Sequence, residues 1–576
     1  MDITKVSDDV RKDHADVIRN LKKAKEPLET RWIVNRAFYD GNHFTFGQID
    51  ETGQVKKVAS KKPYREIPLT TDQIDGQINM LISNKPSPYI YPDERIASEQ
   101  ELVDEEFRAK MEAETLAWGK AVEYLLEEEI KLRKVRRSLA FYGLLYSTAF
   151  MQVMKEKDRY KIEVYDPFEV SIYPTIKSID EYPYLIKHIA RPLKTVENSK
   201  LYSKEVTKGL KERLTENKYF ENANKNNYFS SKLGYADPQT VVIDELYAME
   251  EDGLAIYSYI GDELIHAQSP EETKLKSFPF EMFLTGDLPY GPAPIEKFMP
   301  LNRSIDILIT KLENRVKRLD GGRLAIQASE PIKVISNSDG EFVRWKKHVP
   351  TPLPEENYPS TLINLIGILR ETFSSLGVNA AVSSTGLPAG VEAWRAIESL
   401  KQADYGKMES LRQNMEECLT GITEKLIELI SVEEVTPRTL ILPETQERIQ
   451  IMGEAGVEDG GQGPEGVLVF NAQKRLKVVI ESALTHTPEA TRQFIMELVG
   501  QQLLPPEIAI DRLKLGNTKE IMEKLTLSQT AGQSMVDMPD FAALPKKLQM
   551  AIVQYLSEGA DPAVREQIDG EEFNQQ

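Results

Sequence analysis

Basic side chains are the residues of this sequence whose type and spacing best suit a binding function. Lysine and arginine contact phosphate groups or the carboxylates of a partner protein. One group lies at the end of a predicted helix, over 311–323, where five cations stand against two carboxylates, and a second lies at 341–347. Cations at a helix end also have a plain structural role, because they meet the negative end of the helix dipole. The candidate contact residues are Lys311, Arg315, Lys317, Arg318, Arg323, Arg344, Lys346 and Lys347.

Sequence motifs for nucleotides, cofactors or metals are missing or incomplete. Neither Gly-Lys pair is followed by serine or threonine, so the sequence contains no P-loop. Gly461, Gly463 and Gly466 match the spacing of a dinucleotide-binding loop. However, Pro464 interrupts that loop, and the residues after it predict a strand where a helix is required. The six histidines show no ligand spacing, no Gly-x-Ser-x-Gly segment is present, and Cys418 is the only cysteine. We therefore predict no catalytic site, no cofactor and no metal, and expect that the protein is not an enzyme.

The spacing of apolar residues predicts an α+β protein in which long helices alternate with small mixed β modules. Apolar residues at intervals of three and four predict helices, and alternation of apolar and polar residues predicts strands. Pro300 either kinks the helix predicted at 295–319 or shifts its start. The polar segment 193–238 predicts a surface excursion or a flexible loop. Helices are predicted at 5–39, 71–83, 99–137, 295–319, 359–376, 391–430 and 488–527. Strands are predicted at 149–154, 162–165, 170–173, 184–190, 240–249, 254–260, 323–327, 331–336 and 341–346, with further strands and loops from 434 to 480.

Composition and charge indicate a multidomain globular protein with an acidic surface. The 576 residues are enough for roughly three to five domains, and 41% hydrophobic with 28% charged residues indicate a soluble globular protein. A net charge of −19 disfavours a surface that grips nucleic acid. A single cysteine suits a reducing compartment, and the charged start lacks the features of a secretory signal. The uncharged segment Ser138–Met154 is too short to span a membrane, so we expect no membrane partner.

The order of these elements resembles that of the portal proteins of tailed bacteriophages. The resemblance extends from about Phe38 to Leu525 and depends on short segments in a consistent order and spacing. These segments are Phe38-Tyr39-Asp40-Gly41, Gln77-Ile78-Asn79 followed by Asn84-Lys85-Pro86, Tyr142-Gly143, the run from Val164 to Val170 with Pro174 behind it, and Tyr290-Gly291-Pro292-Ala293-Pro294 before a helix with Asn302.

The resemblance implies a division of the chain into a wing, a stem, a clip and a crown. The sequence lacks the long helical C-terminal barrel that some portal proteins have, which affects the size of the crown. Residues 1–290 would form the wing, 291–319 the first stem helix, 320–357 the clip, 358–376 the second stem helix, 377–390 the tunnel loop, 391–487 the long helix and returning wing strands, 488–527 the crown helices and 528–576 a polar tail. The tunnel loop would centre on Val382, Ser383, Ser384, Thr385, Gly386, Leu387 and Pro388.

The resemblance also implies a function and a set of partners. Portal proteins form rings, usually of twelve subunits, at one capsid vertex, and double-stranded DNA is packaged and ejected through the ring. We therefore expect a homo-oligomer located in the virion and assembled in the host cytoplasm. Its expected partners are the DNA in the channel, the terminase large subunit, head-to-tail connector proteins, and the major capsid and scaffold proteins.

Two other functions stay open at the level of sequence. The chain is also compatible with another virion or scaffold component built from long helices, without an axial channel. An enzyme with an unfamiliar site is the second alternative, supported by chain length and by the glycine-rich loop at 461–466. The segment 382–388 is small and uncharged, which suits a surface that follows DNA without binding it, but it equally suits a plain connection between helices.

Overall fold

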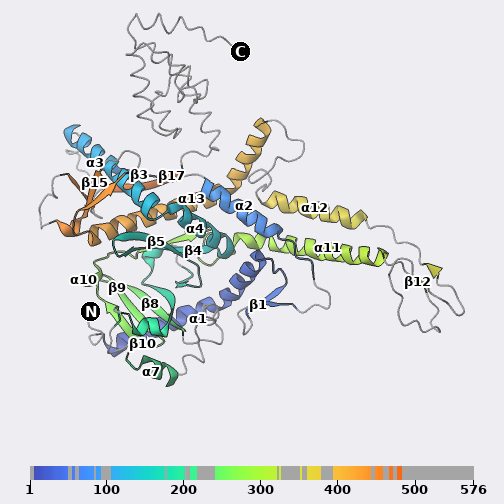
Figure 1. The fold of residues 1–576 in the computed structure, drawn as a ribbon, viewed down its shortest axis with the longest axis horizontal. Coiled ribbons are helices and arrows are strands. Elements are labelled where there is room, and N and C mark those ends of the chain that lie inside the picture. Colours follow the sequence, from blue (N-terminus) through green and yellow to red (C-terminus); the bar gives the residue numbers. More distant parts are fainter. Residues whose placement is uncertain are drawn as a thin grey trace, which may run out of the picture. The chain divides into compact units, whose positions relative to one another are not determined.

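The computed structural model describes residues 6–49, 55–58, 64–83, 86–92, 105–175, 178–199, 201–202, 208–216, 240–320, 324–325, 351–352, 360–377, 394–442, 448–457, 466–470 and 476–482. The chain divides into two units, one formed by Met1–Leu440 with Ile449–Glu481 and the other by Ile441–Arg448 with Ser482–Gln576. The elements described below lie mainly in the first unit. Its helices and antiparallel sheets agree with the predicted α+β class (Figure 1).

The first long helix, α1 (Asp8–Tyr39), follows the helix predicted at 5–39 closely. The Ser7 hydroxyl accepts a hydrogen bond from the Val10 amide, and two aspartates occupy the first turn, where negative charge favours a helix. The helix ends at Asp40 and Gly41, and Gly41 has a φ of 82°, a conformation that glycine adopts without strain. Buried residues recur along α1 from Ile18 to Phe38.

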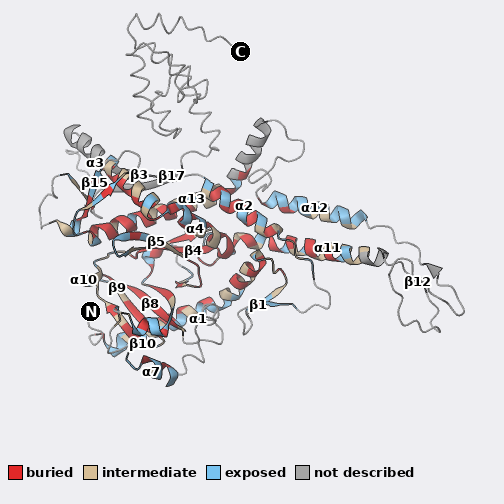
Figure 2. Ribbon diagram, in the orientation of Figure 1, coloured by how far each residue is buried: buried red, intermediate tan, exposed pale blue. Residues whose placement is uncertain are grey.

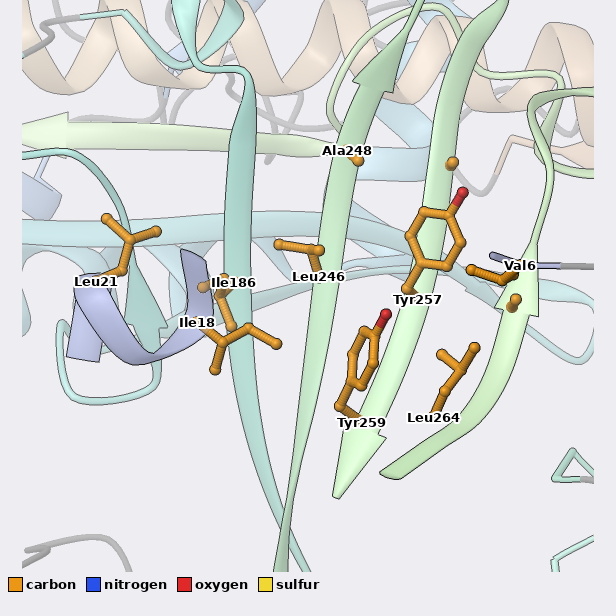
Figure 3. Close-up of a cluster of buried hydrophobic side chains, with 11 residues drawn as sticks. Val6, Ile18, Leu21, Ile186, Leu246, Ala248, Tyr257, Tyr259 and Leu264 are labelled. Atoms are coloured by element: carbon orange, nitrogen blue, oxygen red, sulfur yellow. The ribbon is translucent and has the colours of Figure 1, made fainter. Parts of the chain in front are cut away.

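A five-stranded antiparallel sheet packs against the first half of α1. Alternating residues of its strands point to opposite faces. On one face, Leu246, Tyr257 and Tyr259 pack with Ile18 and Leu21 of α1 (Figure 3). In sheet order its strands are β10 (Glu263–Gln268), β9 (Gly253–Ile260), β8 (Thr240–Glu250), β7 (Tyr184–Pro192) and β6 (Val170–Ser171). The strands predicted at 184–190, 240–249 and 254–260 are confirmed.

The opposite face of this sheet is covered by part of the segment 193–238. Two short helices, α5 (Leu193–Glu197) and α7 (Leu210–Glu216), bury Leu193 and Leu210 against Ile243. Of the two alternatives predicted for 193–238, the flexible loop is therefore wrong for these two helices. The composition of the segment is polar overall, so its few apolar residues did not predict helices. Residues 200, 203–207 and 217–239 lie outside the described residues.

A three-stranded antiparallel sheet forms the second β module. It consists of β4 (Thr148–Glu156) between β11 (Phe280–Leu284) and β5 (Arg159–Tyr165), and α13 (Trp394–Glu433) contacts β4 and β11. Gly143 meets this sheet so closely that a Cβ atom there would lie 2.3 Å from the Phe283 ring. A glycine is therefore required at that position.

The long helix predicted at 99–137 is broken in the structure. It consists of α3 (Glu105–Tyr124), a π-helical turn at Leu125–Glu129 and a separate helix, α4 (Leu132–Tyr146). Lys131 separates the last two with a φ of 61°, a left-handed conformation that no helix interior contains. α4 also continues past Gly143, where the change to strands was expected, and ends at Ser147 with a φ of 69°.

The remaining elements connect these modules. The strands β4, β8 and β9 are largely buried, whereas α12 is mostly exposed (Figure 2). The helices are α2 (Leu69–Ser83), α10 (Pro270–Thr273), α11 (Met299–Asp320) and α12 (Ser360–Leu376), with 3₁₀ turns at Ile179–Glu181, Pro294–Lys297 and Glu454–Gly456. The strands are β1 (Thr45–Ile49), β2 (Val55–Lys57), β3 (Pro86–Pro92), β12 (Leu324–Ala325), β13 (Thr351–Pro352), β14 (Arg438–Ile441), β15 (Arg448–Gly453), β16 (Val467–Phe470) and β17 (Leu476–Ser482).

Candidate functional site

The helices α11 and α12 form a pair that we call the helical hairpin (Figure 1). The predicted helix at 295–319 is a 3₁₀ turn at Pro294–Lys297 followed by α11, so Pro300 lies in the first turn of α11 and shifts its start. A proline is tolerated there because the amides of a first turn have no partner inside the helix. Between α11 and α12, β12 pairs with β13 in antiparallel register. The strands predicted at 331–336 and 341–346 lie outside the described residues.

The segment before α11 is held by side chains of α1. Arg31 donates hydrogen bonds from Nη2 to the carbonyl oxygens of Tyr290 and Gly291, and its Nε lies 3.0 Å from Glu296 Oε1. Asn35 donates to the same Glu296 oxygen at 3.0 Å. The buried Tyr290 has a φ of 59° and donates its hydroxyl proton to the carbonyl of Val170 at 3.2 Å. The segment Tyr290–Pro294, which contributes to the resemblance, is therefore fixed to α1 and to the sheet.

A buried polar cluster holds the first two turns of α11. Asn302 accepts hydrogen bonds from the amide and hydroxyl of Thr70 at 3.0 and 2.9 Å, and donates to the Ile67 carbonyl at 2.9 Å. Asp306 accepts from the Ile67 amide at 3.0 Å, and its second oxygen lies 2.5 Å from His43 Nδ1. Asn302, Asp306 and His43 are fully buried. Because buried polar groups are costly without partners, this cluster fixes the base of the hairpin.

The spacing of polar residues in the sequence indicates this cluster, although the apolar periodicity used to predict the helix does not. Asn302, Asp306 and Thr310 recur every four residues, so they share one face of the predicted helix. All three are buried, and Thr310 accepts a hydrogen bond from the Arg65 amide at 2.8 Å. A polar row on the buried face of an amphipathic helix predicts polar partners elsewhere in the chain.

α12 is exposed over most of its length and carries large apolar side chains beside its buried side. Phe373 is buried and its ring centroid lies 5.4 Å from that of Phe298, which anchors the end of α12 next to the start of α11. Only two of the seventeen residues of α12 are charged. Its exposed apolar side chains lie on both flanks of the buried side, and together we call them the α12 apolar face. They are Ile363 at 50%, Leu365 at 42%, Ile368 at 58% and Leu376 at 52% exposure.

The candidate contact residues are only partly covered by the structure. Lys311 is exposed and Arg315 half-buried, one turn apart on α11, and Arg65 Nε lies 3.9 Å from Glu313 between them. The backbone of Lys317 and Arg318 continues α11. The others lie outside the described residues: Arg323, Arg344, Lys346, Lys347 and the tunnel-loop residues Val382 to Pro388.

Gly377, the first residue of the predicted tunnel loop, is contacted from two sides. Lys407 of α13 donates from Nζ to the carbonyl of Gly377 at 2.8 Å and to that of Ser375 at 3.4 Å. A cation in this position satisfies carbonyls at a helix C-terminus and complements the dipole. Gly377 also approaches α2, since a Cβ atom there would lie 2.0 Å from Gln73 Oε1. The helix predicted at 391–430 is confirmed as α13, Trp394–Glu433.

A second buried polar group links α1 to the five-stranded sheet. Ser171 Oγ lies 2.7 Å from His188 Nε2, and His188 Nδ1 lies 2.7 Å from Asp244 Oδ1, the order of a catalytic triad. Lys22 donates to the other Asp244 oxygen at 2.5 Å, and Lys25 donates to the Phe168 carbonyl at 2.8 Å. The spacing of the histidines in the sequence did not indicate this group, because its members come from different strands and from a distant helix.

Burial determines the chemistry of this group. It lowers the pKa of His188 to about 4, with nearby Lys25 acting in the same direction, so the imidazole is neutral near pH 7. Burial would raise the pKa of Asp244, but Lys22 and the hydrogen bond from His188 bring it to about 2. Burial also lowers the pKa of Lys25 to about 8. The Ser171 side chain is 1% exposed, so a substrate cannot reach its hydroxyl in this structure, and the group serves to dock α1.

No protein-family model matches the sequence, and comparison with curated proteins gives no match. In the part of the chain that the structure describes, no cluster of histidine, cysteine and acidic side chains is arranged to hold a metal ion. Within that same part, no helix combines the length and hydropathy needed to cross a membrane.

Proposed function

We propose that this chain is a non-enzymatic subunit of a phage portal ring. Twelve copies would surround a channel at one capsid vertex, through which double-stranded DNA is packaged and later ejected. The ring would dock the terminase large subunit during packaging and head-to-tail connector proteins afterwards, and would contact the major capsid and scaffold proteins. The resemblance in the order of elements suggests this function, and the helical hairpin supports it.

The observation that carries the proposal is the α12 apolar face. Four large apolar side chains at 42 to 58% exposure on one helix leave apolar area that a contact with another copy would bury. Packing this face against the hairpin of the next copy would repeat one contact around an axis. Such a heterologous contact forms a closed ring when the rotation from one copy to the next is 360° divided by the number of copies. Burial of Ile363 and Ile368 would supply the apolar area.

The polar base of the hairpin suits the same role. A helix that lines a ring must keep one direction relative to its own subunit, because a small tilt would change the rotation between copies. Asn302 and Asp306 fix α11 to the segment 67–70, while Arg31 fixes the residues before α11 to α1. The hairpin is therefore held at its base and leaves the α12 apolar face free for the neighbouring copy.

The test is the mass and shape of the purified chain. A ring of twelve chains of 65.4 kDa has a mass of about 785 kDa, measurable by light scattering, and shows a central hole by electron microscopy. Replacing Ile363 and Ile368 by glutamate places charges in the interface and should leave monomers. Thr195→Glu with Thr215→Glu adds the same charge at exposed positions of α5 and α7, outside the hairpin, and should leave the ring intact.

The outcome separates the alternatives. If the purified chain is monomeric, the test is repeated with capsid and scaffold proteins present. Rings that persist with glutamate at 363 and 368 would show that α12 is not the contact. Open assemblies without a central hole would instead favour another virion component, and monomers in both conditions would contradict the portal proposal.

A further inference from the structure

A basic cleft lies beside the break between the π-helical turn and α4. It has a volume of about 720 Å³ and is bordered by the start of α4 and by the turn that joins β4 to β5. Its lining includes the buried Ile130, Val135 and Ile162 and the half-buried Val164. The size lies in the range of pockets that hold a small ligand or a few residues of a peptide.

Cations dominate the rim of this cleft. Five exposed basic residues line it, and the three acidic residues in the lining leave a net charge of +2. One of the three, Glu129, is already paired with Arg438 at 2.8 Å. In a chain of net charge −19, this is a local reversal of sign. The basic residues are Lys131, Lys134, Lys157, Arg159 and Lys161.

The helix next to the cleft carries its charges against its own dipole. The first turn of α4 contains no acidic residue, and Lys131 at the N-cap makes no side-chain cap hydrogen bond. The sequence from Lys131 to Arg137 instead holds five basic residues in seven positions. Cations at a helix N-terminus are unfavourable for the helix itself. Placements that conflict with local stability tend to mark functional positions, and a bound anion would relieve this conflict.

Several of these cations lack an internal counterion. Lys131 approaches Glu128 at 3.7 Å on the surface. Lys161 donates a hydrogen bond to Glu163 and approaches Glu156 at 3.7 Å. Within the described part of the chain, Lys134, Lys157 and Arg159 form no ion pair. Their charges are thus available to a ligand.

The shape and lining of the cleft indicate which anion it suits. The apolar floor gives no benefit to an inorganic anion, but it can bury an aliphatic side chain. Duplex DNA is a convex cylinder that would contact the rim and leave the apolar floor uncovered. A peptide that combines carboxylates with an apolar side chain satisfies both the rim and the floor.

We propose that this cleft binds an acidic peptide segment of a partner protein, with its carboxylates at the basic rim and an apolar side chain on the Ile130–Ile162 floor. This binding surface does not depend on ring formation, so it can be tested on the chain in any assembly state. Attraction between exposed charges is screened by salt, so binding should weaken as ionic strength rises.

The test uses the full chain and a fluorescent synthetic peptide in which glutamates flank a pair of leucines. Fluorescence anisotropy should detect binding to the natural sequence. Lys134→Glu with Arg159→Glu reverses two rim charges and should lower the affinity about tenfold or more. Lys23→Glu with Lys211→Glu makes the same change in charge at exposed positions away from the cleft and should leave the affinity within about twofold. Circular dichroism checks that both variants are folded.

Two further probes separate the possible ligands. A peptide with serines in place of the leucines should bind about tenfold more weakly if the apolar floor is used. Equal affinity of the natural chain and both variants for the glutamate–leucine peptide would overturn the proposal, as would a lack of binding. The proposal would also be overturned if duplex DNA or pyrophosphate bound at Lys134 and Arg159 while the peptide did not.

Discussion

Acid should weaken the docking of α1 on the five-stranded sheet through a single residue, His188. In the folded chain the pKa of this buried imidazole is about 4, against 6.5 for an ordinary histidine. Between these two values the unfolded chain binds a proton that the folded chain does not take up. The free energy of unfolding therefore falls by about 1.4 kcal/mol per pH unit, or about 3 kcal/mol in total from pH 6.5 to 4.

The charged groups around His188 fix the sign of this effect. Lys22 and Lys25 approach from α1 and oppose a positive imidazole, while Asp244 on β8 favours it. Burial outweighs the carboxylate, so the neutral form persists. Asp244, with a pKa of about 2, contributes stability that is lost only when the pH falls from about 3.8 towards 2, below the window of His188. The two effects are therefore separable by pH.

The measurement compares the natural chain with His188→Gln in urea unfolding at several pH values. Fluorescence is recorded in a background where Trp32, which packs on Phe168 with ring centroids 5.2 Å apart, is the only tryptophan. The variant should be less stable at pH 7, because Asp244 loses a buried partner. The difference in the free energy of unfolding between the two chains should shrink by about 3 kcal/mol towards pH 4, since only the natural chain has the titrating imidazole. His14 and His266, whose pKa values are lowered by burial, titrate in both chains and cancel. A deficit that stays constant between pH 7 and 4 would refute the reasoning.

Two further predictions concern the hairpin. Asn302→Leu leaves the Thr70 amide and the Ile67 carbonyl without partners and should lower the free energy of unfolding by about 3 kcal/mol or more, measured by urea unfolding; a loss below about 0.5 kcal/mol would contradict the role of the cluster. Lys407→Met removes the donor to the Gly377 and Ser375 carbonyls and should speed hydrogen exchange in the last turn of α12 about fivefold, equivalent to about 1 kcal/mol, while the first turn serves as the internal control. Equal changes in both turns would indicate a general loss of stability.

The spacing of apolar residues predicted the helices well where a single row of apolar side chains packs against a single hydrophobic core. The helices α1, α2, α12 and α13 begin and end within a few residues of their predicted bounds. The helix at 99–137 was wrong because its break depends on contacts far along the chain. Glu129 accepts a hydrogen bond from the Tyr160 amide and pairs with Arg438, which is 309 residues away, and these contacts hold the π-helical turn before Lys131.

The candidate site was predictable in its elements but not in its contacts. Sequence spacing located both hairpin helices, yet the polar cluster joins Asn302 to Thr70 across 232 residues and Asp306 to His43 across 263. The basic cleft was missed for a different reason. Its cations come from a helix start at 131–134 and from a strand turn at 157–161, and the sequence does not show that these two segments lie side by side.

Electrostatics explains why an assembly of this chain would need the α12 apolar face. Twelve copies at −19 carry about −228 in total, so acidic surfaces of neighbouring copies repel one another, just as they would repel DNA in a channel. At physiological salt this repulsion is confined to about 8 to 10 Å. Contacts between copies fall within that distance, so they are favoured where charge is sparse and apolar area is large. The α12 helix, with two charged residues in seventeen and four exposed large apolar side chains, meets both conditions. In the proposed ring, the same acidity that would let DNA slide past a wall would therefore favour association of the subunits through a nearly uncharged surface.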